Sequence, residues 1–144
     1  MQHYFNTWQF WALMAAVFAA LTAVFAKLGV ADVNSNFATF LRTLVVVAAF
    51  VPLLWFTGEY ESLTALSGRT VLFLVLSGLA TGASWLCYFR ALQLGQASQV
   101  APIDKLSVVF VAVIAALFLG ERLSAFGWTG VALIAVGAIL VAAG

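Results

Sequence analysis

The residues that could do chemistry in this chain are mostly cations placed beside long apolar runs. Lys27, Arg42, Arg90 and Lys105 each stand within one or two turns of the end of such a run, and Asp104 is the carboxylate among them. Charges beside a membrane span either reach the lipid headgroups or turn toward a polar cavity inside the protein. The chemistry that they predict is therefore ionic, either contact with headgroups or binding of a polar solute.

Aromatic residues form a second candidate group near the end of the apolar run 70–89. Thr81, Trp85 and Tyr88 follow one another at i, i+4 and i+7, so they share one helix face, and Arg90 lies half a turn beyond. Aromatic rings beside a cation suit a site for an amphipathic solute. They suit an aromatic belt at the membrane interface equally well. Both interpretations are open at this point.

Residues for covalent catalysis or metal binding are scarce. Cys87 is the single cysteine, and the single histidine, His3, precedes the first apolar run. The sequence offers no Ser/His/Asp, Cys/His or paired-carboxylate arrangement, and no Cys/His cluster with ligand spacing. We therefore expect no enzymatic activity, no catalytic residue, no metal and no cofactor.

The amino-acid composition indicates whether these residues lie in water or in a membrane. Of the 144 residues, 65% are hydrophobic and 8% are charged, whereas soluble domains carry about 25% charged residues. The net charge of +1 gives no basic surface that would favour nucleic acid as a partner. The chain is thus predicted to be an all-α integral membrane protein, with the lipid bilayer as a partner and one compact domain over residues 1–144.

Stretches without Asp, Glu, Lys or Arg locate the helices, because about 20 residues cross the ~30 Å hydrocarbon core. Such stretches cover residues 1–26, 43–58, 70–89, 106–120 and 123–144. The second and fourth are short, so their helices must extend past Arg42 and past Lys105, which places these charges inside or at the rim of the membrane. The sequence predicts a bundle of five transmembrane helices at about 8–28, 37–57, 70–93, 102–120 and 124–143.

Pro102 leaves two placements for the start of the fourth helix. If Pro102 occupies the first helical position, Asp104 falls in the first turn, where a carboxylate is favoured by the unpaired N–H groups. If the helix starts near Ser98, Pro102 interrupts it within the membrane, and interrupted helices mark binding sites in membrane proteins. The sequence does not choose between the two.

The charges are unequal at the two membrane faces that five spans define. The cations at one face are Lys27, Arg42, Arg90 and Lys105, and those at the other are Arg69 and Arg122. Asp104 is the ion-pair partner available to the first group, and a surplus of cations remains. This surplus follows the positive-inside rule if the cations face headgroups. It favours a neutral, zwitterionic or anionic solute if they face a cavity, and no mid-membrane carboxylate is present to serve a drug cation.

Small residues on the third span permit close helix packing. Gly78 and Gly82 form a GxxxG pair, which suits either packing within the chain or a seam between two chains.

Several segments resemble the EamA-type repeat of the drug/metabolite transporter superfamily. The most specific is LFLGERL followed by the glycine-spaced last helix, residues 117–144. WLCYFRALQLG at 85–95 is similar to the third helix of that repeat, and AKLG at 26–29 and Arg42 also fit. The resemblance covers nearly the whole chain.

This resemblance implies a small single-repeat transporter of the bacterial and archaeal five-helix group, a multi-pass protein of the prokaryotic cytoplasmic (inner) membrane. Most such proteins carry two inverted five-helix repeats, and a single repeat implies pairing with a second copy. We therefore expect a homodimer. An antiparallel arrangement of the two copies would reproduce the inverted ten-helix transporter.

The resulting hypothesis is a secondary transporter protomer that moves a small-molecule solute by alternating access. Arg90 and Lys105 are predicted to contact a carboxylate or phosphate of the solute, and Asp104 to hold Lys105 in place. The alternative is a non-transporting or lipid-handling subunit that binds a headgroup or a partner protein. The predicted substrate-path residues are Lys27, Arg42, Trp85, Tyr88, Arg90, Asp104 and Lys105.

Overall fold

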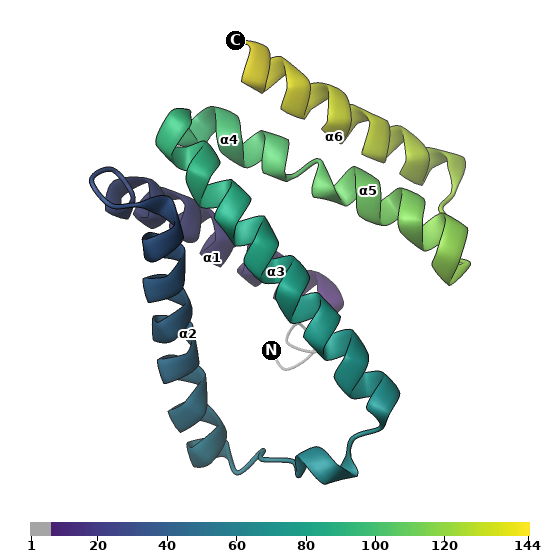
Figure 1. Cartoon of the computed structure of the whole chain (residues 1–144). Coiled ribbons are helices and arrows are strands. Elements are labelled where there is room, and N and C mark those ends of the chain that lie inside the picture. Colours follow the sequence, from purple (N-terminus) through teal and green to yellow (C-terminus); the bar gives the residue numbers. More distant parts are fainter. Residues whose placement is uncertain (1–6) are drawn as a thin grey trace. The chain divides into compact units, whose positions relative to one another are not determined.

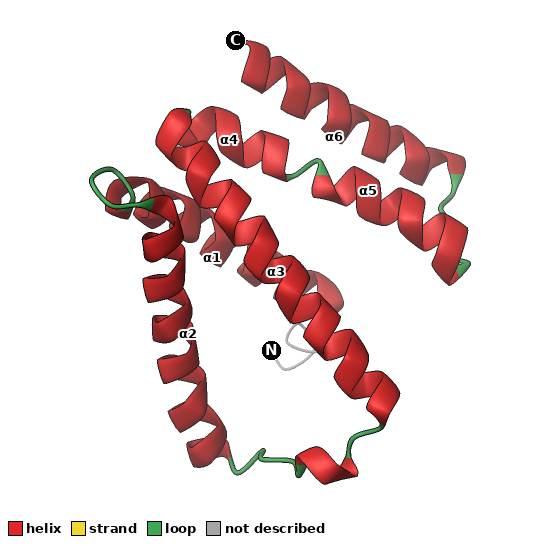
Figure 2. Cartoon of the chain, in the orientation of Figure 1, coloured by secondary structure: helices red, strands yellow, loops and turns green. Residues whose placement is uncertain are grey.

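The structure is a computed structural model that describes residues 7–144, and His3 lies outside these residues. The described residues form helices joined by short loops, without a strand (Figure 2). The elements, labelled in Figure 1 where space allows, are α1 (Trp8–Gly29), α2 (Ser35–Thr57), the 3₁₀ turn η2 (Leu63–Ala65), α3 (Gly68–Leu94), α4 (Ala97–Asp104), α5 (Ser107–Ile114), the π-helical segment η3 (Ala115–Leu119) and α6 (Ala125–Ala143).

Five segments of the described chain are long and apolar enough to cross a membrane. They are α1, α2, α3, the combined segment Ala97–Leu119 and α6. The predicted fold class, an all-helical protein with five membrane-spanning helices, is therefore confirmed. The chain is a multi-pass membrane protein.

The ends of α2 follow from local hydrogen bonding and backbone conformation. The Asn34 Oδ1 atom accepts hydrogen bonds from the backbone N–H groups of Asn36 and Phe37, at 2.9 and 3.4 Å. It thereby satisfies donors that have no partner inside the helix. Gly58 ends α2 in the left-handed conformation with φ of 69°, which glycine adopts without the steric cost of a side chain.

The fourth span is interrupted. α4 begins at Ala97 and contains Pro102, and the helix ends at Asp104. The backbone N–H of Leu106 then donates to the Ile103 carbonyl at 3.0 Å, a tight turn that replaces the helical bond to the residue four positions back. Of the two placements that the sequence left open, the structure therefore has the early start and the broken helix.

The chain divides into two compact units. One unit contains α1 up to Lys27 and the chain from Leu94 onward, and the other contains Leu28–Gln93, with α2 and α3. In the first unit, α6 packs along α4 and α5 (Figure 1), and the buried side chains on the packed helices are small ones such as Ala112 and Ala138. That the whole chain acts as a single domain stays a prediction.

In the second unit the buried residues come from three neighbouring places: the turn between α1 and α2, the first turns of α2 and the last turns of α3. They are Val30, Ser35, Thr39, Phe89 and Leu92. The start of α2 and the end of α3 are thus the best-packed part of this unit. The candidate site lies on these two helix ends.

Candidate functional site

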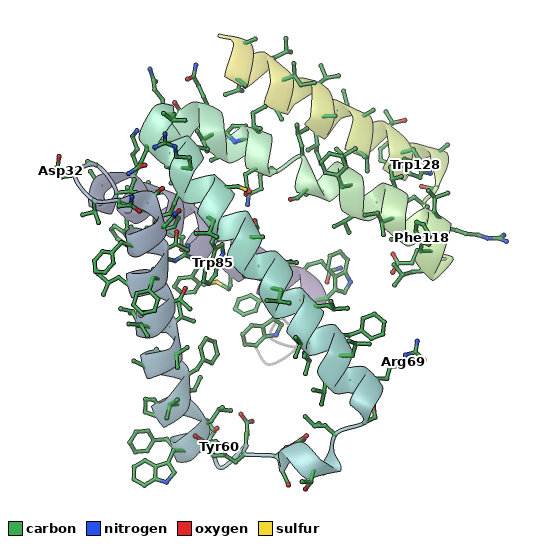
Figure 3. The ribbon with its side chains drawn as sticks, in the orientation of Figure 1. Asp32, Tyr60, Arg69, Trp85, Phe118 and Trp128 are labelled. Carbon is green, nitrogen blue, oxygen red and sulfur yellow. The ribbon has the colours of Figure 1, made fainter. Side chains whose placement is uncertain are left out.

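Arg42 stacks on two aromatic rings of α3. It lies roughly two turns, or ~10 Å, inside α2. Its guanidinium carbon is 4.2 Å from the ring centre of Trp85 and 5.5 Å from that of Phe89. Figure 3 shows the Trp85 side chain between the ribbons of α2 and α3. Both distances lie within the ~6 Å range of cation–π attraction, so the two rings stabilise the cation inside the membrane span.

The guanidinium of Arg42 keeps its hydrogen-bonding capacity. Arg42 is half-buried, and within residues 7–144 the structure records neither an ion pair nor a hydrogen-bond acceptor for its N–H groups. A guanidinium has five N–H donors in a planar fork, which match the two oxygens of a carboxylate or a phosphate. A guanidinium held by its faces can still donate from its edge, so this arrangement is chemically suited to bind an anion while the rings hold the cation.

Arg90, on the last turns of α3, is exposed and has a neutral partner. Its Nη1 atom donates to Gln93 Oε1 at 3.2 Å. The Nε2 atom of Gln93 in turn donates to the backbone carbonyls of Val30 and Val33, at 3.1 and 2.6 Å. Arg90 is thus attached through Gln93 to the turn between α1 and α2. Tyr88 is half-buried on the same helix.

The first unit holds the remaining predicted residues. Lys105 Nζ lies 3.3 Å from Asp104 Oδ2, and both side chains are well exposed, at 56% and 36%. This pair stands at the interruption of the fourth span. Lys27, at the end of α1, donates from Nζ to the Gly95 carbonyl at 2.7 Å. It thereby ties the end of α1 to the short connection between α3 and α4.

The predicted residues therefore fall into two groups. Arg42, Trp85, Tyr88 and Arg90 belong to the second unit, and there Arg42 meets Trp85 directly. The other three, Lys27, Asp104 and Lys105, belong to the first unit. A single solute path that combines both groups stays a prediction. No cluster of three His, Cys, Asp or Glu side chains with metal-binding geometry occurs in the described part of the chain.

Two residues that contact the second group were not predicted from the sequence. Phe89 shares the Arg42 guanidinium with Trp85, and its signal was its position four residues further along the same helix face. In the sequence, Gln93 is noted only within the segment 85–95 that resembles the EamA-type repeat. Its signal was that of an uncharged polar residue three positions after Arg90, on the same face of an apolar helix.

Comparison with known proteins identifies the family. The model of the EamA-like transporter family matches residues 6–143. A relative from Sinorhizobium sp, named "Uncharacterized transporter in cobO 3'region", is 60% identical over 137 residues, which cover 95% of this chain and 97% of the relative. No solved structure matches the chain at a significant level. The family resemblance seen in the sequence is confirmed, and this family is one of transporters rather than of enzymes: the chain belongs to the EamA-like transporter family.

Proposed function

We propose that this protein is one protomer of a secondary transporter that moves a small neutral to anionic solute by alternating access. Membership in a transporter family supports movement of a solute across a membrane. The observation that carries the class of solute is the Arg42 guanidinium, stacked on Trp85 and Phe89 with no anionic partner among the described residues.

The physical argument rests on what an arginine costs inside a membrane. A charged side chain at this depth is unfavourable by a few kcal/mol or more unless it is paired or solvated. Two aromatic rings offset part of this cost, at roughly 0.5–2 kcal/mol for a cation–π contact. A carboxylate or phosphate of the solute would offset more, because it adds charge-assisted hydrogen bonds. The adjacent rings suit an apolar part of the same solute.

A homodimer is part of the proposal. A single five-helix repeat supports pairing with a second copy, and the GxxxG face of α3 is open. A Cβ atom added at Gly78 or Gly82 would meet no heavy atom within 4 Å. An antiparallel pair in the cytoplasmic membrane of a prokaryote is the arrangement that we propose, since it would give ten helices with inverted symmetry.

Thermal unfolding of the purified full chain with a small panel of probes tests the site. We expect benzoate or inorganic phosphate to raise the Tm of the wild type, because a ligand that binds only the folded state stabilises it. The cation tetraphenylphosphonium should not. Arg42→Ala should abolish the increase. The matched control is Arg69→Ala, because Arg69 also lies over a ring, that of Phe73 at 5.8 Å, at the opposite end of α3.

Solute counterflow in liposomes that contain only this chain separates transport from the alternative. Counterflow of the stabilising anion supports a transporter if it is present in the wild type and absent in Arg42→Ala. Stabilisation by an anion without counterflow identifies a subunit that binds a lipid headgroup or a partner protein but transports no solute. A wild type that no anion of the panel stabilises, or an Arg42→Ala variant that responds like the wild type, would overturn the proposed site.

A further inference from the structure

Gln93 links two parts of the second unit that are distant in the sequence. Its Nε2 atom donates to the carbonyls of Val30 and Val33 in the turn between α1 and α2, and its Oε1 atom accepts from Arg90. Both ends of the side-chain amide are therefore used, which a glutamine can do because it carries two donors and one acceptor.

The two carbonyls that Gln93 binds have no helical partners. Val30 directly follows Gly29, the last residue of α1, and the carbonyl groups at the end of a helix lack intrahelical donors. Val30 is also fully buried, with 0% of its surface exposed. A buried carbonyl without a donor is costly, so Gln93 supplies what the turn itself lacks.

We propose that Gln93 is a positioning residue that fastens the α1–α2 turn to the last turn of α3 and holds Arg90 in a fixed direction. Through this amide, the turn and the Arg90 guanidinium change position together. The consequence for transport rests on the proposed function, because a solute that meets Arg90 would then be sensed by the turn. The coupling itself does not depend on which solute is carried.

Two substitutions separate the two halves of the link. Gln93→Leu removes both the donors and the acceptor. Gln93→Glu, at mildly alkaline pH, keeps oxygens that pair with Arg90 but loses the N–H groups that bind the turn. Gln9→Leu, at an exposed glutamine of α1, is the matched control.

Each half has its own measurement on the purified full chain. Mobility of the turn is read from a spin label at Asp32→Cys, in the exposed turn (Figure 3), with the exposed Cys87 replaced by serine. The freedom of Arg90 is read from its rate of modification by phenylglyoxal, mapped by mass spectrometry, with the exposed Arg69 as internal reference.

The expected results differ between the variants. Gln93→Leu should mobilise the label and raise the modification rate of Arg90 about fivefold, the change that loss of one typical hydrogen bond produces. Gln93→Glu should mobilise the label while Arg90 stays protected. Gln9→Leu should change neither. A label that stays equally immobile in Gln93→Leu and Gln93→Glu, or an Arg90 whose rate is the same in Gln93→Leu and wild type, would overturn the proposal.

Counterflow of the anion that stabilises the wild type is measured on the same variants to keep the two proposals apart. If wild-type protein shows no counterflow but the label and Arg90 respond as expected, the proposed function fails and the coupling stands. If counterflow is normal and neither the label nor Arg90 responds to Gln93→Leu, the coupling fails and the proposed function stands.

Discussion

Arg42 of α2 lies with its guanidinium carbon 4.2 Å from the centre of the Trp85 ring on α3. This contact joins two helices of the second unit about two turns inside α2, where a charge within a membrane span needs a partner. It gives the cation a partner without neutralising it. The remaining anion-binding capacity of Arg42 is the basis of the proposed function.

Removal of the Trp85 ring should destabilise the protein. We expect Trp85→Ala to lower the free energy of unfolding by about 1–2 kcal/mol, because the cation–π contact with Arg42 is lost. Trp85→Phe keeps a ring and should cost less than half as much. Unfolding in mixed micelles of dodecylmaltoside and SDS measures both. Equal effects of the two substitutions would contradict the prediction, because they would show that a retained aromatic ring gives Arg42 no stabilisation.

Lys27 should stabilise the first unit through the Gly95 carbonyl. We expect Lys27→Met, which keeps the aliphatic stem but loses the 2.7 Å hydrogen bond, to lower the free energy of unfolding by about 1–3 kcal/mol. Lys105→Met is the control. Its exposed pair with Asp104 should contribute at most about 1 kcal/mol, so the prediction does not survive if Lys105→Met is the more damaging change.

Asn34 should stabilise the start of α2, and with it the helix that carries Arg42. Asn34→Ala removes the acceptor for two backbone N–H groups and should cost about 1 kcal/mol. Asn34→Ser keeps an oxygen acceptor at this position and should lower the stability much less than Asn34→Ala does. Asn36, two residues further along, contributes only its backbone N–H to the cap. The control Asn36→Ala should therefore change stability by less than about 0.5 kcal/mol.

The proposed dimer can be tested on the open face of α3. A leucine at Gly82 would keep two backbones apart. We expect Gly82→Leu to reduce self-association on the order of tenfold, or ~1.4 kcal/mol. Energy transfer between donor-labelled and acceptor-labelled chains in liposomes measures this. Ala83→Leu changes the neighbouring, exposed position and should leave the transfer intact, whereas equal transfer in both variants would place the seam elsewhere.

The helices and their number could be predicted because they depend on local properties of the sequence. The apolar runs, extended past a flanking charge in the second and fourth spans, are long enough to cross a bilayer, and their backbone groups must be satisfied within each helix. The interruption of the fourth span, which follows Asp104 rather than Pro102 itself, was only half predictable. Proline restricts its own helical position and the preceding turn, but where the helix starts depended on the residues from Ala97 onward.

What the sequence by itself determined is the class of the protein, the family resemblance and the set of charges that enter the membrane region. Only the tertiary structure decided which partners these charges have. Arg42 meets Trp85 and Phe89, and Arg90 meets Gln93, which holds Val30 and Val33. The physical reason is that cation–π contacts and hydrogen bonds act over a few ångströms. They depend on which faces of distant helices meet, and apolar periodicity alone does not specify those faces.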